Sequence, residues 1–154
     1  VPAVRARVVA VQFLLVTGRD HALRGQLHGS TLRRTEGVTV FGFVNNLEEL
    51  LEVSDVVVTK AGGLTVSECL AKGTPLAIPS VIPGQEEDNV AFLLRHRVAV
   101  TARTPVAMAA AVAPLLTDRV EAAERRARCR ELGKPNAAAD LADDVLRQIE
   151  TSGE

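Results

Sequence analysis

The chain has 154 residues, of which 47% are hydrophobic and 24% charged, as expected for one globular domain with its own core. A formal net charge of −1 and the absence of Trp and Tyr argue against a general nucleic-acid-binding protein, which needs basic surfaces and aromatic stacking platforms. Two isolated cysteines indicate a reducing compartment, and no run approaches the ~18 apolar residues of a membrane span.

Apolar, β-branched runs alternate with amphipathic segments along most of the chain. The runs predict strands at residues 8–17, 38–44, 55–59, 75–79 and 98–101. The segments between and after them predict helices at residues 20–27, 46–53, 64–72, 86–96, 105–116, 119–132 and 136–149. Residues 151–154 should form a frayed tail. This alternation predicts an α/β fold, a Rossmann-like parallel sheet with helices on both faces.

Glycines and polar residues gather where the predicted strands end. Gly18 and Arg19 follow the first strand, and Gly42 lies within the second. Residues 60–63 follow the third strand, and residues 82–86 follow the fourth. Ligands of parallel α/β sheets bind beyond the carboxyl ends of the strands. The sequence therefore predicts a ligand site at this edge.

Residues 59–68 (TKAGGLTVSE) run from a strand end through a glycine pair into a helix. Gly62 and Gly63 allow the backbone to approach a ligand closely. The N–H groups of about residues 64–66 begin the helix without intrahelical acceptors, which predicts a phosphate site. A tight turn that needs glycine for steric reasons explains the same pair, and both interpretations remain open.

Three charged residues support the phosphate interpretation. Glu68 lies about one turn into the helix, where a carboxylate can accept two hydrogen bonds from vicinal hydroxyls such as those of a ribose. Its alternative role is a carboxylate favoured by the helix dipole. Arg19 and Lys60 can approach a diphosphate, but Arg19 also fits a helix entry capped by Asp20, and Lys60 also fits an ordinary solvated lysine.

Residues 83–89 (PGQEEDN) form a polar stretch before an apolar helix. Gln85 offers a donor and an acceptor and Glu86 a strong acceptor, so together they can read the hydroxyls of a sugar. The alternative is an acidic first helical turn, which we prefer for Glu87 and Asp88.

Other residue types give no further site. His21, His28 and His96 have no partner at metal-ligand spacing, so no metal is expected. No G-x-S-x-G, P-loop or complete G-x-G-x-x-G motif is present, so hydrolase, ATPase and ordinary dehydrogenase functions lack support. We interpret the arginines within residues 125–130 as a solvated helix face.

These segments together resemble the C-terminal domain of family 28 glycosyltransferases, over roughly residues 8–149. The glycolipid branch is most similar, namely monogalactosyldiacylglycerol synthases and bacterial diacylglycerol glucosyltransferases. The segments that carry the resemblance are residues 40–44 (VFGFV), 59–68, 71–75 (AKGTP) and 82–86 (IPGQE), together with Asn89.

The resemblance implies a two-domain GT-B enzyme whose C-terminal half binds a UDP-sugar. It implies inverting transfer of a hexose, galactose or glucose, to a diacylglycerol-type lipid, with no metal or other cofactor. The acceptor pocket, the membrane-binding surface and the expected catalytic base lie in an N-terminal domain absent here, so we assign no catalytic residue. The full-length enzyme is then expected to be cytoplasmic and peripheral at the membrane, with no nucleic-acid partner.

Matching positions imply individual roles. Glu68 matches the glutamate that holds the ribose hydroxyls. Gln85 and Glu86 match the residues that hold the donor sugar, and Asn89 sits close by. The other implied nucleotide contacts are Gly18 and Arg19 on the phosphate side, Gly42, Phe43 and Val44 facing the uracil, and Gly63, Leu64 and Thr65 at the diphosphate.

The sequence departs from the family at its start. Family domains begin with a further strand, a Gly-rich loop and a helix, whereas residues 1–7 resemble only the tail of that helix. We therefore expect one N-terminally truncated domain over residues 1–150, lacking a strand that would lie inside the sheet.

Three other functions fit the same residues. One is a half-enzyme that needs a separate acceptor-domain chain, and another is a GT-B-fold UDP-sugar epimerase, against which the Pro-Gly-Gln-Glu run argues. The third is a non-catalytic nucleotide-sugar-binding module.

Overall fold

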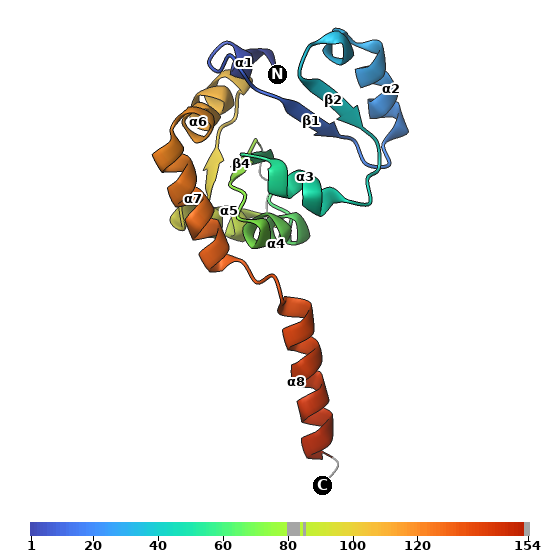
Figure 1. The fold of residues 1–154 in the computed structure, drawn as a ribbon, viewed down its shortest axis with the longest axis vertical. Coiled ribbons are helices and arrows are strands. Elements are labelled where there is room, and N and C mark those ends of the chain that lie inside the picture. Colours follow the sequence, from blue (N-terminus) through green and yellow to red (C-terminus); the bar gives the residue numbers. More distant parts are fainter. Residues whose placement is uncertain (80–83, 85, 153–154) are drawn as a thin grey trace.

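The computed structural model describes residues 1–79, 84 and 86–152, which alternate between strands and helices (Figure 1). The strands are β1 (Phe13–Val16), β2 (Val38–Phe41), β3 (Val57–Val58), β4 (Leu76–Ile78) and β5 (Ala99–Thr101). The helices are α1 (Pro2–Arg5), α2 (His21–Gly29), the 3-10 helix η1 (Thr31–Arg34), α3 (Leu47–Val53), α4 (Gly63–Lys72), α5 (Glu87–Arg95), α6 (Pro105–Thr117), α7 (Arg119–Leu132) and α8 (Ala137–Ser152).

The predicted fold class is confirmed, but the strands form two parallel sheets instead of one. β1 pairs with β2, with Phe13 opposite Val38, and the second sheet has the order β3-β4-β5. Within the described residues, β1 and β3 each have one edge with no ladder. Residues 8–12, predicted as strand, lie outside β1, because a strand forms only where a neighbour pairs with it.

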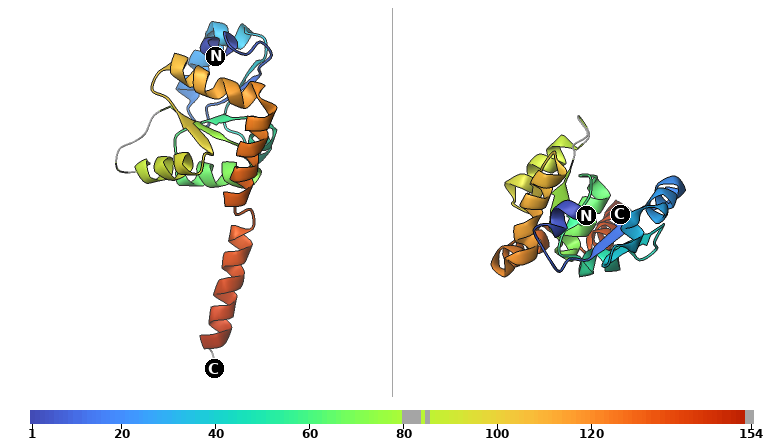
Figure 2. Two further views of the ribbon diagram at one scale, coloured as in Figure 1. Left: turned by 90° about the vertical axis from the view of Figure 1, so that its left-hand side faces the viewer. Right: turned by 90° about the horizontal axis from the view of Figure 1, so that it is seen from above.

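The core is built around β4, whose side chains alternate between two helical layers. Leu76 and Ile78 pack with buried residues of α3, α4 and α5. Ala77 faces the other way, toward Met108 and Val112 of α6. Helices therefore cover both faces of the three-stranded sheet, as Figure 2 shows, and its carboxyl edge is left to the connecting loops.

Several predicted helix ends are confirmed in detail. Gly73 ends α4 in the left-handed region with φ 71°, where glycine is favoured. Asp20 caps α2 by accepting a 2.8 Å hydrogen bond from the Leu23 N–H. Asn46 takes the N-cap position of α3, but its side chain donates to Glu49 instead of capping the helix.

The arginines of α7 correct one sequence interpretation. They were expected on a solvated face, yet the Arg125 side chain is only 17% exposed and donates to the Ala99 carbonyl. Arg126 donates to the Ser54 carbonyl and pairs with Asp55. Ala99 begins β5 and Ser54 precedes β3, so α7 is fastened by long-range hydrogen bonds that a sequence pattern does not reveal.

Helix α8 projects from the rest of the molecule (Figure 1), and its residues 137–151 are all exposed. The expected frayed tail is partly wrong, since the helix continues through Ser152, and residues 153–154 lie outside the described part. In the part of the chain that the structure describes, no helix has the length and apolar character needed to cross a bilayer.

The end of α7 packs against α4 so closely that Gly133 is required. A Cβ atom added there would lie 2.5 Å from the Leu70 carbonyl oxygen and 2.8 Å from the Ala71 Cα, which are backbone atoms that cannot easily move. Gly133 has φ −65°, so the requirement is steric and not conformational.

Gly133→Ala should therefore destabilise the protein by roughly 1–3 kcal/mol, the usual cost of overpacking. Gly25→Ala is the matched control, because Gly25 lies inside α2 and no atom of the described part of the chain is within 4 Å of an added Cβ. Alanine there should stabilise by ~0.5–1 kcal/mol. Urea unfolding measures both variants. Equal effects would contradict the close approach.

The two cysteines are fully buried in the core that joins α4 and α7. Burial raises the pKa of Cys69 to about 12 and that of Cys129 to about 11. Both thiols are thus neutral and structural at physiological pH.

We expect Cys69 and Cys129 to resist a thiol reagent at pH 8 in the folded protein and to react once urea unfolds it. Their raised pKa values mean that the stability they contribute is complete below pH 9.0, the ordinary thiol value, and is lost as the pH rises toward 11 and 12. Peptide mass spectrometry locates the label. Rapid labelling of either residue in the native protein would contradict the prediction.

Candidate functional site

The candidate site begins at the turn between β3 and α4. Helix α4 starts at Gly63, and the first intrahelical hydrogen bond runs from the Val66 N–H to the Gly62 carbonyl at 3.0 Å. The expected unpaired set, residues 64–66, is therefore wrong by one position. Among the described residues, the N–H groups of Gly63, Leu64 and Thr65 have no acceptor, and Gly62 supplies no capping side chain.

These three N–H groups lie where a ligand can reach them. Among the described residues, no atom lies within 4 Å of a Cβ added at Gly63, and Leu64 is 85% exposed. Glu68 is also exposed, one turn along the same helix, so its carboxylate is available to a ligand. The arrangement can bind an anion at the helix start and hydroxyl groups at Glu68.

Residues at the start of α5 contact the turn and stabilise it. The Asn89 side chain donates a 2.8 Å hydrogen bond from Nδ2 to the carbonyl of Ala61, which is fully buried. The Glu86 carboxylate lies 3.5 Å from the Lys60 Nζ, and Glu86 is 3% exposed whereas Lys60 is exposed. Lys60 is thereby positioned beside the glycine pair by a buried negative charge.

Of the three predicted sugar-binding residues, the structure describes two. Glu86 and Asn89 are brought to the glycine turn, but both are engaged with it and not with open solvent. Gln85 lies outside the described residues. Their role toward a donor sugar stays a prediction.

The other predicted contacts form a second group at the carboxyl ends of β1 and β2. Gly18 has φ 59°, and the Arg19 guanidinium stacks 5.0 Å from the centre of the Phe43 ring, which is 60% exposed. Val44 follows as a half-buried residue. Each group lies at the carboxyl end of its own sheet, and no hydrogen bond or ion pair of the described residues joins them.

Arg24 was not predicted from the sequence. A Cβ added at Gly42 would lie 3.0 Å from its Nη1, so glycine leaves room for this guanidinium beside the second group. The sequence offered one indication that Arg24 lies near this group, namely its position in the helix that follows β1. Of the residues the structure describes, no three His, Cys, Asp or Glu side chains are grouped as metal ligands.

Residues 2–143 match the family described as "Glycosyltransferase family 28 C-terminal domain". The chain belongs to this family. The chain is also 30% identical over 138 residues to a "Processive diacylglycerol beta-glucosyltransferase" of Bacillus cereus (strain ATCC 10987 / NRS 248), a match that covers 90% of this chain and 36% of the relative. It thus spans about a third of that relative's length.

Solved glycosyltransferases share the fold. The "Glycotransferase of kitacinnamycin" superposes with a TM-score of 0.64 at 23% identity, covering 94% of this chain and 39% of that one. The glycosyltransferase VinC, solved "in complex with DTDP", superposes with a TM-score of 0.56 at 16% identity, covering 94% and 44%. The likeness places the family 28 chain in the C-terminal half of a GT-B fold.

The Asn89 hydrogen bond gives a prediction about the site's rigidity. Asn89→Ala removes the donor to a buried carbonyl, which should cost about 1–3 kcal/mol of stability and speed amide exchange at residues 61–65. Asp88→Ala, at an exposed neighbouring position on α5, should leave that exchange unchanged. Hydrogen exchange read by mass spectrometry compares the two, and equal protection in both variants would count against the tether.

Proposed function

We propose that this family 28 domain binds the UDP-sugar donor of an inverting glycosyltransferase that moves a hexose to a diacylglycerol-type lipid. The observation that carries the proposal is the start of α4, where three unpaired N–H groups and an exposed Glu68 lie one helical turn apart. This spacing suits a diphosphate followed by a ribose.

The relatives support the donor and acceptor classes. The name of the Bacillus cereus relative specifies glucose, a β linkage and diacylglycerol, and VinC was solved with a nucleoside diphosphate. UDP-glucose carries its sugar in an α linkage, so a β product requires inversion at the anomeric carbon. Glucose is accordingly the hexose that we favour.

In this proposal the domain contributes to catalysis by stabilising the leaving group. Negative charge develops on the diphosphate as the sugar leaves, and the N–H groups of residues 63–65 with the nearby Lys60 oppose that charge. Glu68 fixes the ribose, and Gln85, Glu86 and Asn89 orient the sugar. No metal is needed in this scheme, and the base and the lipid pocket belong to the rest of the protein, which also provides peripheral contact with the membrane.

Glu68→Ala in the full-length protein should weaken UDP binding by about 10- to 150-fold, because a charged hydrogen-bond acceptor contributes roughly 1.5–3 kcal/mol. Glu131→Ala is the control, since Glu131 is an exposed glutamate on α7. Titration calorimetry measures both affinities. Absence of UDP binding, or equal affinity of the Glu68→Ala variant and the parent, would refute the donor site.

Transfer itself is tested separately with UDP-glucose, UDP-galactose and vesicles that contain diacylglycerol. The expected product is a β-linked hexosyl lipid from UDP-glucose. UDP binding without any lipid product would leave a nucleotide-binding domain and overturn the transferase proposal.

A further inference from the structure

A hollow of about 270 Å³ lies between the end of α5 and the outer side of α7. Leu94 of α5, Arg97 of the turn that follows it and Ala99 of β5 line one side. Helix α7 contributes Glu121, Glu124, Arg125 and Arg128. Helix α5 begins at the carboxyl edge of the sheet and runs back, so this hollow lies at the amino edge, opposite the glycine turn.

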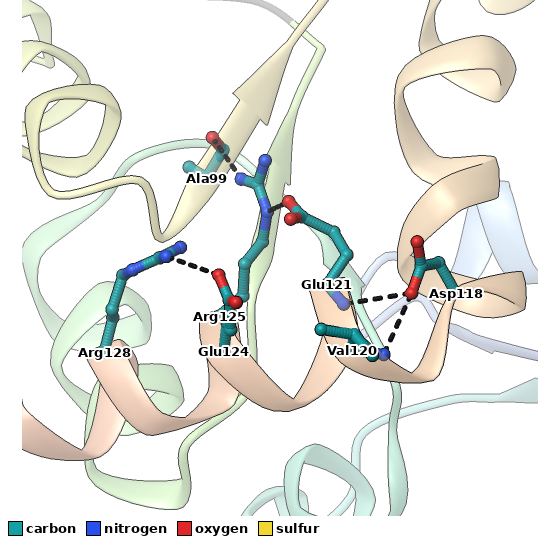
Figure 3. A network of polar contacts seen from close by, with 7 residues as sticks. All are labelled: Ala99, Asp118, Val120, Glu121, Glu124, Arg125 and Arg128. Atoms are coloured by element: carbon teal, nitrogen blue, oxygen red, sulfur yellow. Dashed lines mark hydrogen bonds and ion pairs between the residues drawn. The ribbon is translucent and has the colours of Figure 1, made fainter.

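Helix α7 presents two ordered ion pairs to the hollow, drawn in Figure 3. The Arg125 Nε lies 2.5 Å from a Glu121 oxygen, and its Nη1 donates to the Ala99 carbonyl at 3.2 Å. The Arg128 Nη2 donates to Glu124 at 2.8 Å. Each glutamate is thus neutralised by an arginine of its own helix. A guanidinium has five N–H donors, and these contacts leave some donors of each arginine available.

Arg97 is the lining residue that adds unbalanced charge. The lining holds three arginines and two glutamates, which leaves a net charge of +1. Arg97 is exposed, and within the described residues its guanidinium makes no hydrogen bond or ion pair. Because Arg125 and Arg128 are each paired with a glutamate, Arg97 is the guanidinium of the lining whose charge no carboxylate of the described residues balances.

The backbone of Arg97 is also unusual. It is the one non-glycine residue with positive φ in the described chain, at 55°. Its N–H donates to the Leu94 carbonyl and the Val98 N–H to the Leu93 carbonyl, both at 3.1 Å, which is the helix ending that normally takes glycine. Arginine here costs conformational free energy, and such an outlier points to a role for the side chain.

We propose that this hollow binds a phosphate group, with Arg97 as the principal contact and Arg125 and Arg128 as supporting donors. A planar guanidinium fork matches a phosphate, and the net charge of +1 suits a singly charged phosphodiester or inorganic phosphate. Because the hollow lies at the opposite edge of the sheet, this site is separate from the proposed donor site and does not depend on it.

Arg97→Gly tests the proposal sharply, because glycine suits the backbone while removing the guanidinium. In the full-length protein the variant should be as stable as the parent or more so, and should bind phosphate at least about fivefold more weakly. Arg97→Lys keeps the charge but not the fork, and should fall between the two. Arg95→Gln, an exposed arginine on α5, should change nothing.

Two probes distinguish the sources of the phosphate. Calorimetry with inorganic phosphate, in saturating UDP to fill the donor site, reports a free ligand. Flotation with phosphatidylcholine vesicles, with and without phosphatidylglycerol, reports a lipid head group. Loss of binding in Arg97→Gly in either arm supports the site and names its source. No binding by the parent in both arms, or no weakening by Arg97→Gly in either arm, overturns it.

Discussion

The path of the turn between β3 and α4 is the constraint on which the candidate site depends. The turn is fixed before it reaches the glycines, because the Thr59 N–H donates to the Ala77 carbonyl and the Ala61 carbonyl accepts from Asn89. Ala61 itself is fully buried. The next residue, Gly62, is half-buried, and α4 starts at Gly63 with three N–H groups that have no acceptor among the described residues. The position of these N–H groups thus depends on the anchoring of one alanine.

The strand order of the two sheets fits a doubly wound fold in which one further strand lies between them. In the described chain β1 pairs only with β2, and β3 only with β4, so each has an open edge. A parallel strand between those edges would give the order β2-β1-x-β3-β4-β5, which matches the 3-2-1-4-5-6 order of dinucleotide-binding folds. Leu14, Val16 and Val58 are exposed apolar residues on these two strands, as expected for residues that an inner strand would cover. Such a strand would also bring the Arg19–Phe43 group and the glycine turn to one continuous edge.

Local chemistry made much of the fold predictable from the sequence. Gly73 and Asp20 mark helix ends through backbone conformation and a side-chain cap, and both effects act within a few residues. The α4 start was misplaced by one residue because a glycine can serve either as cap or as first helical residue. The predicted strands were too long, because an apolar run does not show where the neighbouring strand, and with it the pairing, ends.

Long-range pairing made the rest unpredictable. Glu86 was predicted as an acceptor for sugar hydroxyls, yet its carboxylate is buried against Lys60, 26 positions earlier in the chain. Arg125 and Arg126 likewise appear as a surface cluster until their partners, the Ala99 and Ser54 carbonyls, are known. In each case the sequence supplies the charge, and the tertiary fold supplies the partner that determines burial.

The arginines also show how structural and ligand-binding charges can be separated. Arg125 and Arg126 each donate to a backbone carbonyl outside α7, and Arg128 pairs with Glu124 of its own helix, so each of the three has a partner within this chain. Arg97 satisfies none in the described residues and occupies a backbone conformation that glycine would adopt at lower cost. A structural role predicts that removing a side chain lowers stability, whereas Arg97 is placed so that its removal should raise stability or leave it unchanged. The expected sign of this stability change, and not the positive charge alone, is our reason for proposing a ligand in the hollow at the amino edge.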